Sequence, residues 1–509
     1  RFSREIAQAT GSSRVLFSNP ELDAEGKLHN RVFLAEKGEL RPLSAAMAKS
    51  FVPNAYMDFI MELGGEAFSL SIDGQERRIA VLLGDFTEKE LPESLISADL
   101  LIDLSQRPLF FDRDPTPPLA LERDYIQVNG CGILNSGSAC YLLPGGSRCY
   151  SYGRLDFVAP CFKPGLYSCF GSVELPEQDE LLREGLVAGV SAFMKQINCG
   201  KAVIGLSGGI DSALAACIYS RALGPENVYL ISMPTRYNSE KTKSLAEELA
   251  AALSCPFAVI PVEEDALRLR EQIEKAEFSI AGLGREKLHL GDLAWENLMA
   301  RERGRILAAA SSALGGIFTC NGNKAELTVG YATFYGDLAG GFAAQADLWK
   351  HQVYAASRAF QQILPEAPMD RIAAIRPSAE LSWKQAVDEG LGDPLLYDYH
   401  DHLLRYWVEK GGSILEALRA YDAAELEELL GCAPGLVKGY FPTREHFIED
   451  LERWWKQYRG IGIAKRIQAP PLLALSSHPF GEALPQSQLP VLFDTAYLQC
   501  RERKCWRRS

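Results

Sequence analysis

The sequence lacks several features that would define whole classes of protein. Its twelve cysteines include no C-x-x-C pair, which argues against a zinc knuckle or a disulfide framework and favours reduced thiols in a cytoplasm. No run reaches the roughly 18 apolar residues that a membrane span needs, and no signal-peptide pattern is present. Positive charge is also scarce, because 53 Lys and Arg stand against 66 Asp and Glu, a net charge of −13. This balance disfavours nucleic acid and anionic membranes as partners.

The remaining composition is that of an ordinary globular protein. Of the 509 residues, 47% are hydrophobic and 23% are charged, which is enough for two or three domains with a core each. The chain begins at Arg1 rather than at methionine, so we expect a truncated or processed start. The sequence therefore predicts a water-soluble, cytoplasmic protein.

The pattern of strands and helices changes at about residues 160–180. The earlier region predicts strands over 78–86, 98–105, 126–134 and 138–146. The later region begins with a helix over 180–197, after which strands over 201–207, 227–234 and 256–262 alternate with helices over 213–223 and 239–253. Such alternation predicts an α/β fold with a doubly wound parallel sheet. We also expect a solvated acidic helix over 422–430, and a structural role for His400 and His402, which point apart on a helix.

The stretch S-G-G-I-D-S at 207–212 lies between a predicted strand and a predicted helix. Glycines let the backbone approach a ligand, and the N–H groups that begin a helix bind phosphate oxygens. Asp211 would repel a phosphate unless a cation lies between them, so its presence predicts magnesium. The alternative is a tight turn in which Asp211 only caps the helix. A G-K-[ST] ending is missing, which argues against a kinase or a GTPase.

This stretch resembles the pyrophosphate loop of the ATP pyrophosphatases, and the following blocks resemble NAD synthetase in particular. They include E-N-L-M-A-R-E-R at 296–303, N-G-N-K-A-E-L-T-V-G-Y at 321–331, D-L-W-K at 347–350, R-P-S-A-E-L at 376–381 and A-K-R-I-Q-A-P-P at 464–471. The chain therefore resembles the NAD synthetases of the glutamine-dependent, two-domain type. The resemblance implies a nitrilase-like domain over 1–160, a linker over 161–180, a Rossmann-like ATP pyrophosphatase domain over 181–480 and a tail over 481–509.

The resemblance also implies an activity, which is ATP-dependent amidation of deamido-NAD+ to NAD+. The substrate carboxylate would attack the α-phosphate of ATP, giving an acyl-adenylate and pyrophosphate, and ammonia would then displace AMP. ATP is the co-substrate and Mg2+ the cofactor. Ammonia would be free or supplied by a separate glutaminase, with glutamine as a possible donor. Members of this family form oligomers, so we expect a homo-oligomer.

Site residues follow from the resemblance one by one. ATP contacts are implied for Gly205, Leu206, Ser207, Gly208, Gly209, Ile210, Asp211, Ser212, Asn321, Lys350 and Ser378. Asn321 stands where relatives often have threonine. Deamido-NAD+ contacts are implied for Asn297, Arg301, Glu326 and Lys465, and magnesium contacts for Asp211 and Glu326. Asp211, Lys350 and Asp337 are the expected catalytic residues, with Asp337 orienting or deprotonating the incoming ammonium. The alternative for each residue alone is a surface charge or a helix cap.

The amino-terminal region resembles an amidase that has lost its Glu, Lys, Cys triad. K-S-F-V-P-N at 49–54 resembles the lysine segment, so Lys49 is the expected remnant. Gly84 stands where the nucleophilic cysteine is expected, and glycine cannot form a thioester. Glu21 is expected in a turn rather than in the triad. We therefore expect an inactive glutaminase site. The alternatives are a glutamine-dependent synthase with an unrecognised site, another amidating ATP pyrophosphatase such as GMP synthetase, and a non-catalytic scaffold.

Overall fold

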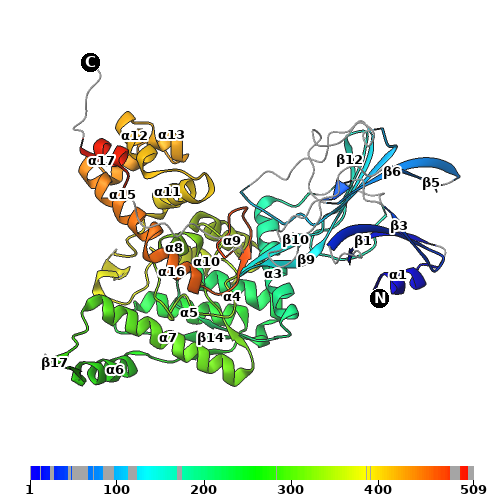
Figure 1. The fold of residues 1–509 in the computed structure, drawn as a ribbon. Helices are drawn as coiled ribbons and strands as arrows, with labels where there is room; N and C mark the ends of the chain where they lie inside the picture. The colour runs from blue at the N-terminus through cyan, green and yellow to red at the C-terminus, as the bar shows by residue number, and fades with distance from the viewer. Residues whose placement is uncertain are drawn as a thin grey trace, which may run out of the picture. The chain divides into compact units, whose positions relative to one another are not determined.

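The computed structural model divides the chain into two compact units, Arg1–Glu177 and Gln178–Ser509, which Figure 1 draws in blue to cyan and in green to red. It describes residues 2–11, 13–22, 28–43, 47–48, 67–72, 74–83, 97–112, 123–168, 173, 175–281, 284–385, 387–389, 391–481 and 493–502. In the part of the chain covered by these ranges, no helix is both long enough and apolar enough to cross a bilayer.

The first unit is built mainly from strands. After helix α1 (Phe2–Ala9), strands β1 (Arg14–Leu22), β2 (Leu28–Glu36) and β3 (Glu39–Leu43) form an antiparallel sheet. A larger sheet has the order β12-β11-β8-β7-β6-β4, with β5 beside β6. Its strands are β4 (Met47–Ala48), β5 (Phe68–Ile72), β6 (Gln75–Leu83), β7 (Leu100–Ser105), β8 (Asp124–Asn129), β11 (Arg148–Ser151) and β12 (Arg154–Val158).

The strands β4, β6, β7 and β8 of the larger sheet run parallel. Strand β6 has five consecutive buried residues, and the side chains of β7 alternate between buried and partly buried. Val32 of the smaller sheet packs in one cluster with Ile79, Val81 and Leu83 of β6. Apolar faces of the two sheets therefore form a common core.

Three expectations for the first unit need correction. The predicted strand over 126–134 is two strands, because β8 ends before Gly130 and β9 (Cys131–Ser136) then pairs with β10 (Ala139–Pro144). Glu21 is not in a turn, since Pro20 and Glu21 pair with β2 at the end of β1; proline is tolerated because β1 is an edge strand. Nine described cysteines are free thiols but Cys149 is disulfide-bonded, so the expectation of reduced thiols is wrong there.

The second unit contains the predicted parallel sheet. Its strand order is β15-β14-β13-β18, and every pair is parallel. The strands are β13 (Ala202–Gly205), β14 (Val228–Ser232), β15 (Phe257–Val259) and β18 (Ile317–Phe318). Ala202, Val203 and Ile204 are fully buried, as expected for the centre of a sheet that is covered on both faces.

Helices follow the strands in alternation and cover this sheet (Figure 1). Helices α3, α4 and α9 pack against one another, whereas α7 packs against β13, β18 and α6. Gly189 of α3 lies so close to Leu473 that a Cβ would come within 2.6 Å of it. The helices are α3 (Gln178–Gln196), α4 (Ile210–Leu223), α5 (Glu240–Leu253), α6 (Glu263–Lys275), α7 (Asp292–Leu314), α8 (Lys324–Val329), α9 (Lys350–Ile363) and α10 (Met369–Ala373). A short hairpin joins β16 (Glu277–Ile280) to β17 (Gly284–Lys287).

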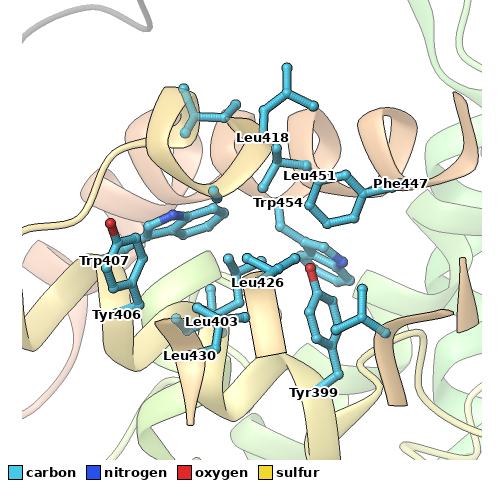
Figure 2. Close-up of a cluster of buried hydrophobic side chains, with 14 of the residues drawn as sticks. Tyr399, Leu403, Tyr406, Trp407, Leu418, Leu426, Leu430, Phe447, Leu451 and Trp454 are labelled. Carbon is cyan, nitrogen blue, oxygen red and sulfur yellow. The ribbon is translucent and has the colours of Figure 1, made fainter. Parts of the chain in front are cut away.

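A helical region follows in the sequence, and Figure 2 shows its aromatic core, in which Tyr399, Phe447 and Trp454 lie close together. Its elements are α11 (Tyr397–Glu409), α12 (Ile414–Ala423), α13 (Leu426–Leu430), α14 (Leu436–Tyr440), α15 (Arg444–Arg459), α16 (Ile461–Gln468), β19 (Leu472–Ala474) and α17 (Thr495–Glu502). The acidic helix predicted over 422–430 is divided, because α12 ends at Ala423 and α13 begins at Leu426. Glu425 and Glu428 are exposed as expected, whereas Leu426 and Leu430 are buried.

His400 has the structural role that the sequence predicts. It is fully buried, and its Nε2 lies 3.0 Å from Asp450 Oδ2. Its Nδ1 accepts a hydrogen bond from the backbone N–H of Leu396 at 2.7 Å. His402 Nδ1 lies instead 3.3 Å from the carbonyl oxygen of Leu430. The two rings therefore contact different partners.

Candidate active site

The glycine-rich loop lies at the carboxyl end of β13, where ligands bind in open parallel sheets. Ser207 Oγ and Ser212 Oγ are 3.0 Å apart, and the N–H of Gly209 donates to Ser207 Oγ at 3.2 Å. Ser212 Oγ also donates to the carbonyl oxygen of Gly209 at 2.9 Å. The two hydroxyls therefore hold the loop in shape. Gly209 is the N-cap of α4, and with no side chain it leaves the first turn of the helix open to a ligand.

Gly208 is required by the geometry of this turn. Its φ of +83° is in the left-handed region, and a Cβ at this position would lie 2.1 Å from the carbonyl oxygen of Thr242. Thr242 belongs to the first turn of α5. The loop is therefore pressed directly against the backbone of a neighbouring helix, at a spacing that only glycine permits.

Lys350 is buried beside the aspartate of the loop. Its side chain is 1% exposed, and Nζ lies 2.5 Å from Asp211 Oδ2. The ammonium also lies 4.7 Å from the centroid of the Tyr397 ring. Burial alone would lower the pKa of Lys350, but the charges of Asp211 and Glu326 outweigh burial and raise it. Lys350 is therefore a fixed positive charge at the base of the site.

Glu326 is presented by the short helix α8. Asn323 caps this helix through a capping box, in which its side chain accepts from the N–H of Glu326 and its own N–H donates to Glu326 Oε2 at 3.2 Å. Asn323 Nδ2 reaches both carboxylates, at 2.8 Å from Glu326 Oε1 and 3.2 Å from Asp211 Oδ1. One amide group thus links the two acidic residues that the sequence pairs as magnesium ligands.

The carboxylates outnumber the cations in this part of the site. Burial, followed by the negative charge of Asp211, raises the pKa of Glu326 to about 8, although Lys350 opposes the shift. Burial also raises the pKa of nearby Asp393. The hydroxyl of Tyr397 lies 3.1 Å from Glu326 Oε1 and 3.4 Å from Asp393 Oδ2. An additional positive charge would stabilise this cluster.

Asp337 approaches from the loop that follows α8. Its Oδ1 accepts a hydrogen bond from the N–H of Thr333 at 2.5 Å. Desolvation raises the pKa of Asp337, against the effects of this bond and of the positive charges of Lys465 and Arg303. A carboxylate with a raised pKa is suited to proton transfer near neutral pH.

Two cavities meet at these residues. The smaller, of about 130 Å3, is lined by Gly209 and Ile210 at the start of α4 and by residues 375–380. The larger, of about 230 Å3, includes the apolar side chains of Leu206, Met233 and Leu307. Both cavities are lined by Ser207, Asp211, Ser212, Glu326, Asp337, Ser378 and Ala379. The shared residues form the junction at which a group lying in one cavity would face a group lying in the other.

The remaining predicted ATP residues lie around these cavities. Gly205 and Asn321 line the larger one, and Asn321 Nδ2 lies 3.4 Å from the carbonyl oxygen of Gly205. Ser378 Oγ donates to the carbonyl oxygen of Gln385 at 2.6 Å. Gly208 and Lys350 are not among the lining residues of the two described cavities. Gly208 packs against the backbone of Thr242, and Lys350 contacts Asp211.

The predicted deamido-NAD+ residues other than Glu326 gather at the loop over 330–335. Asn297 Oδ1 accepts from Thr333 Oγ1 at 2.7 Å, and Arg301 Nε donates to the carbonyl oxygen of Phe334 at 3.0 Å. Lys465 Nζ donates to the carbonyl oxygens of Gly330 and Ala332 at 2.7 and 2.5 Å. None of the three lines either described cavity. Lys49 and Gly84, which bear on the amidase prediction, lie outside the described residues.

Sequence reasoning missed Glu380, although it belongs to the R-P-S-A-E-L block. Glu380 is buried and has a φ of +47°. Its carboxylate accepts from the N–H of Ser239 and from the side chains of Asn238 and Thr242, each at 3.0 Å. It therefore joins the loop over 376–381 to the start of α5, which in turn contacts Gly208. A single buried acidic residue in a short loop gives no periodic signal, so only the structure reveals this role.

The residues present fit a magnesium ion. The described residues contain no cluster of three or more His, Cys, Asp or Glu side chains arranged around a common metal position. Asp211 and Glu326 instead offer two carboxylates, and burial, followed by the negative charge of Asp211, raises the pKa of Glu326. Magnesium commonly binds through one or two carboxylates and completes its shell with phosphate oxygens and water. The pair therefore suits a magnesium ion that arrives with a phosphate ligand.

Residues 182–429 match the family model described as NAD synthase. The chain is 37% identical over 242 residues to a glutamine-dependent NAD(+) synthetase of Thermotoga maritima, covering 47% of this chain and 39% of that relative. It is 37% identical over 275 residues to the protein of the same name from Synechocystis, covering 53% and 46%. The matched part thus spans less than half the length of these curated relatives.

Solved structures show the same fold. A glutamine-dependent NAD(+) synthetase from Cytophaga hutchinsonii superposes with a TM-score of 0.72 at 16% identity, covering 98% of this chain and 87% of that one. A second, from Acinetobacter baumannii in complex with ADP, gives 0.60 at 21% identity, covering 84% and 79%. The predicted fold class, a doubly wound α/β domain preceded by a nitrilase-like fold, is therefore confirmed.

Proposed function

We propose that this protein makes NAD+ by ATP-dependent amidation of deamido-NAD+, because residues 182–429 match the family model described as NAD synthase. The observation that carries the proposal is the junction of the two cavities, where Asp211, Glu326 and Asp337 come together. The smaller cavity adjoins the start of α4 and suits the β- and γ-phosphates. The larger, more apolar cavity suits the nucleoside. The α-phosphate would then lie at the junction.

The reaction needs an activated carboxyl group, because a carboxylate is a poor electrophile toward ammonia. In the first step the deamido-NAD+ carboxylate attacks the α-phosphate, and the bond to the β-phosphate breaks. The N–H groups at the start of α4 hold the departing pyrophosphate. Lys350 fixes Asp211 through the 2.5 Å contact. Asp211 and Glu326 would hold a magnesium ion, which would supply Lewis-acid and template chemistry when bound.

In the second step ammonia attacks the acyl carbon and AMP leaves. Ammonia reaches a protein mostly as ammonium, which must lose a proton before it can attack. Asp337 lies at the junction and has a raised pKa, so it can accept that proton. Asn297, Arg301 and Lys465 hold the adjacent loop by hydrogen bonds. We propose that these three side chains bind deamido-NAD+ together with the loop that they hold.

The source of ammonia forms a second part of the proposal. We propose that the chain's own glutaminase site is inactive, because Gly84 stands where the nucleophilic cysteine is expected. The protein would use free ammonia, or ammonia from a separate glutaminase, and it would work as a homo-oligomer in the cytoplasm. The names of the curated relatives favour the alternative, a glutamine-dependent synthase.

One assay tests both parts. Purified protein with ATP, magnesium and deamido-NAD+ should release NAD+, AMP and pyrophosphate when ammonium chloride is supplied, but not when glutamine alone is supplied. Asp211→Asn should lower the ammonium-dependent rate by about 100-fold or more, because it removes a charge from the junction. Equal turnover with glutamine would refute the inactive glutaminase. No NAD+ with either donor would refute the synthase.

A further inference from the structure

Arg303 is one of three arginines at alternate positions on α7, and no role above uses it. Arg301 donates to the carbonyl oxygen of Phe334. Arg305 is 62% exposed and pairs with Asp265 at 3.2 Å and with Glu302 at 2.6 Å. Arg303 differs from both, because it lines the larger cavity.

The hydrogen bonds of Arg303 leave its guanidinium poorly satisfied. NH1 lies 3.4 Å from the carbonyl oxygen of Ala379, and NH2 lies 3.4 Å from Asn238 Oδ1. Nε is buried and has no hydrogen-bond partner among the described residues. Arginine carries five N–H donors, and a buried donor without an acceptor is costly. The group therefore has donor capacity that a ligand in the cavity could use.

The charges around Arg303 keep the guanidinium in place. Burial lowers the pKa of Arg303, whereas the nearby charges of Glu380 and Asp337 oppose this shift. Asn238 connects Arg303 to Glu380, since its Nδ2 donates to Glu380 Oε2 at 3.0 Å. Arginine stays protonated in proteins, so the cavity has a permanent donor on this wall.

The other residues of this wall suit a planar, apolar group. Ala300, Gly304 and Leu307 line the cavity together with Arg303, because residues three and four apart share one face of a helix. Met233 and Leu206 line the same cavity. Gly209 and Ile210, the N-cap and the first residue of α4, line only the smaller of the two cavities, and the N–H groups at a helix start attract phosphate. Arg303 therefore lines the cavity that suits a nucleotide base and does not line the cavity that suits the β- and γ-phosphates.

We propose that Arg303 is a base-binding residue, which donates hydrogen bonds from its guanidinium to ring-nitrogen acceptors of the nucleotide base in the larger cavity. This inference rests on the proposed function, because it takes the nucleoside of ATP as the occupant. Arg303 raises the binding affinity for the base and does not change the binding affinity for pyrophosphate.

Calorimetric titration of the full chain with three ligands tests the proposal. AMP probes the larger cavity, pyrophosphate probes the smaller one, and ribose 5-phosphate probes binding without a base. Arg303→Met should weaken AMP binding by about tenfold or more, since a hydrogen bond from a charged donor is stronger than a neutral one. The affinities for pyrophosphate and ribose 5-phosphate should stay within about twofold. Arg305→Met, on the same helix, should change none of the three.

The outcomes separate this inference from the proposed function. Unchanged AMP affinity in Arg303→Met would overturn the role of Arg303, while the synthase assay would still stand. An equal loss of AMP and pyrophosphate would also overturn it, because Arg303 would then only support the shape of the site. If Arg303→Met does not fold, Arg303→Lys serves instead, with AMP binding reduced and pyrophosphate binding unchanged. A wild-type chain that binds neither ligand would refute the proposed function itself.

Discussion

Single residues show most directly how backbone geometry serves this site, and Gly208 is the sharpest case. A Cβ at Gly208 would lie 2.1 Å from the carbonyl oxygen of Thr242, at a φ of +83°. We therefore expect Gly208→Ala to displace the loop and to abolish ATP-dependent turnover, as a steady-state assay would show. Gly431→Ala is the matched control, because φ there is +72° and nothing lies within 4 Å. It should cost about 1 kcal/mol of stability and leave turnover intact. Normal activity in Gly208→Ala would contradict the close packing.

Glu326 should make the stability of the protein depend on pH when no ligand is present. Its pKa in the folded protein is about 8, above the ordinary value of 4.5. Between these values the folded protein keeps a proton that the unfolded chain releases, so unfolding becomes easier as the pH rises from 4.5 to 8. Glu326→Gln cannot ionise and still suits a capping box. Its stability advantage over the wild type in urea unfolding should thus be larger at pH 8 than at pH 6. An equal difference at both pH values would contradict the shifted pKa.

Among single residues, the sequence predicts those that belong to a motif with a known chemical role. Asp211 and Glu326, the two predicted magnesium ligands, line the same two cavities, and Lys350 contacts Asp211. Arg303 and Glu380 could not be found in the same way. Their contacts depend on which side of a helix or loop faces a cavity. The sequence does not distinguish them from the other arginines and glutamates nearby, because the residue types are the same.

Among the elements, the short helix α8 begins with a buried lysine, Lys324, which pairs with Asp347 and, at 3.7 Å, with Glu409. Lys324 and Asp347 are both fully buried, with Nζ 2.8 Å from Oδ1. Nζ also donates to Ser476 Oγ at 2.7 Å. This pair fixes the start of the helix that presents Glu326. Removing one partner of a buried pair leaves an uncompensated charge, which costs about 3–5 kcal/mol. We expect Lys324→Met to lower the free energy of unfolding by about this amount.

The matched control for this prediction is an exposed lysine in an ion pair. Lys275 is 76% exposed and lies 3.1 Å from Glu271, and exposed pairs contribute about 0–1 kcal/mol. Lys275→Met should therefore leave the urea midpoint almost unchanged. A loss below about 1 kcal/mol in Lys324→Met would mean that Asp347 finds other partners.

The elements that the sequence predicts well are those with strong periodicity. The strands and helices from β13 to α5 occur where their apolar patterns place them. The segment over 126–134 reads as one strand in the sequence because its apolar run continues across Gly130, where the chain passes from β8 to β9. The segment over 422–430 reads as one helix because its acidic residues continue past the break after Ala423, where Ala424 has a φ of +60°. Turns of this kind depend on tertiary packing rather than on local composition.

For the whole molecule, every residue that lines the two cavities belongs to the unit Gln178–Ser509. Ligands for these cavities should therefore protect this unit from hydrogen exchange, because binding suppresses local opening. We expect AMP with pyrophosphate to slow exchange over residues 203–212, 319–326 and 376–381, and to leave residues 124–158 unchanged, as measured by mass spectrometry. The Gly208→Ala protein, in which we expect the loop to be displaced, is the control: the same ligands should not slow its hydrogen exchange. Protection over 124–158 alone would contradict a site within the second unit.

The common wall of the two cavities has a consequence for inhibition. A fragment held against Gly209 and a fragment held against Met233 would meet at Ser378 and Asp211. Joining two such fragments by a short linker makes the second contact intramolecular, so it benefits from an effective concentration in the millimolar range. Weak binders of the separate cavities would thereby combine into one tight, two-headed inhibitor.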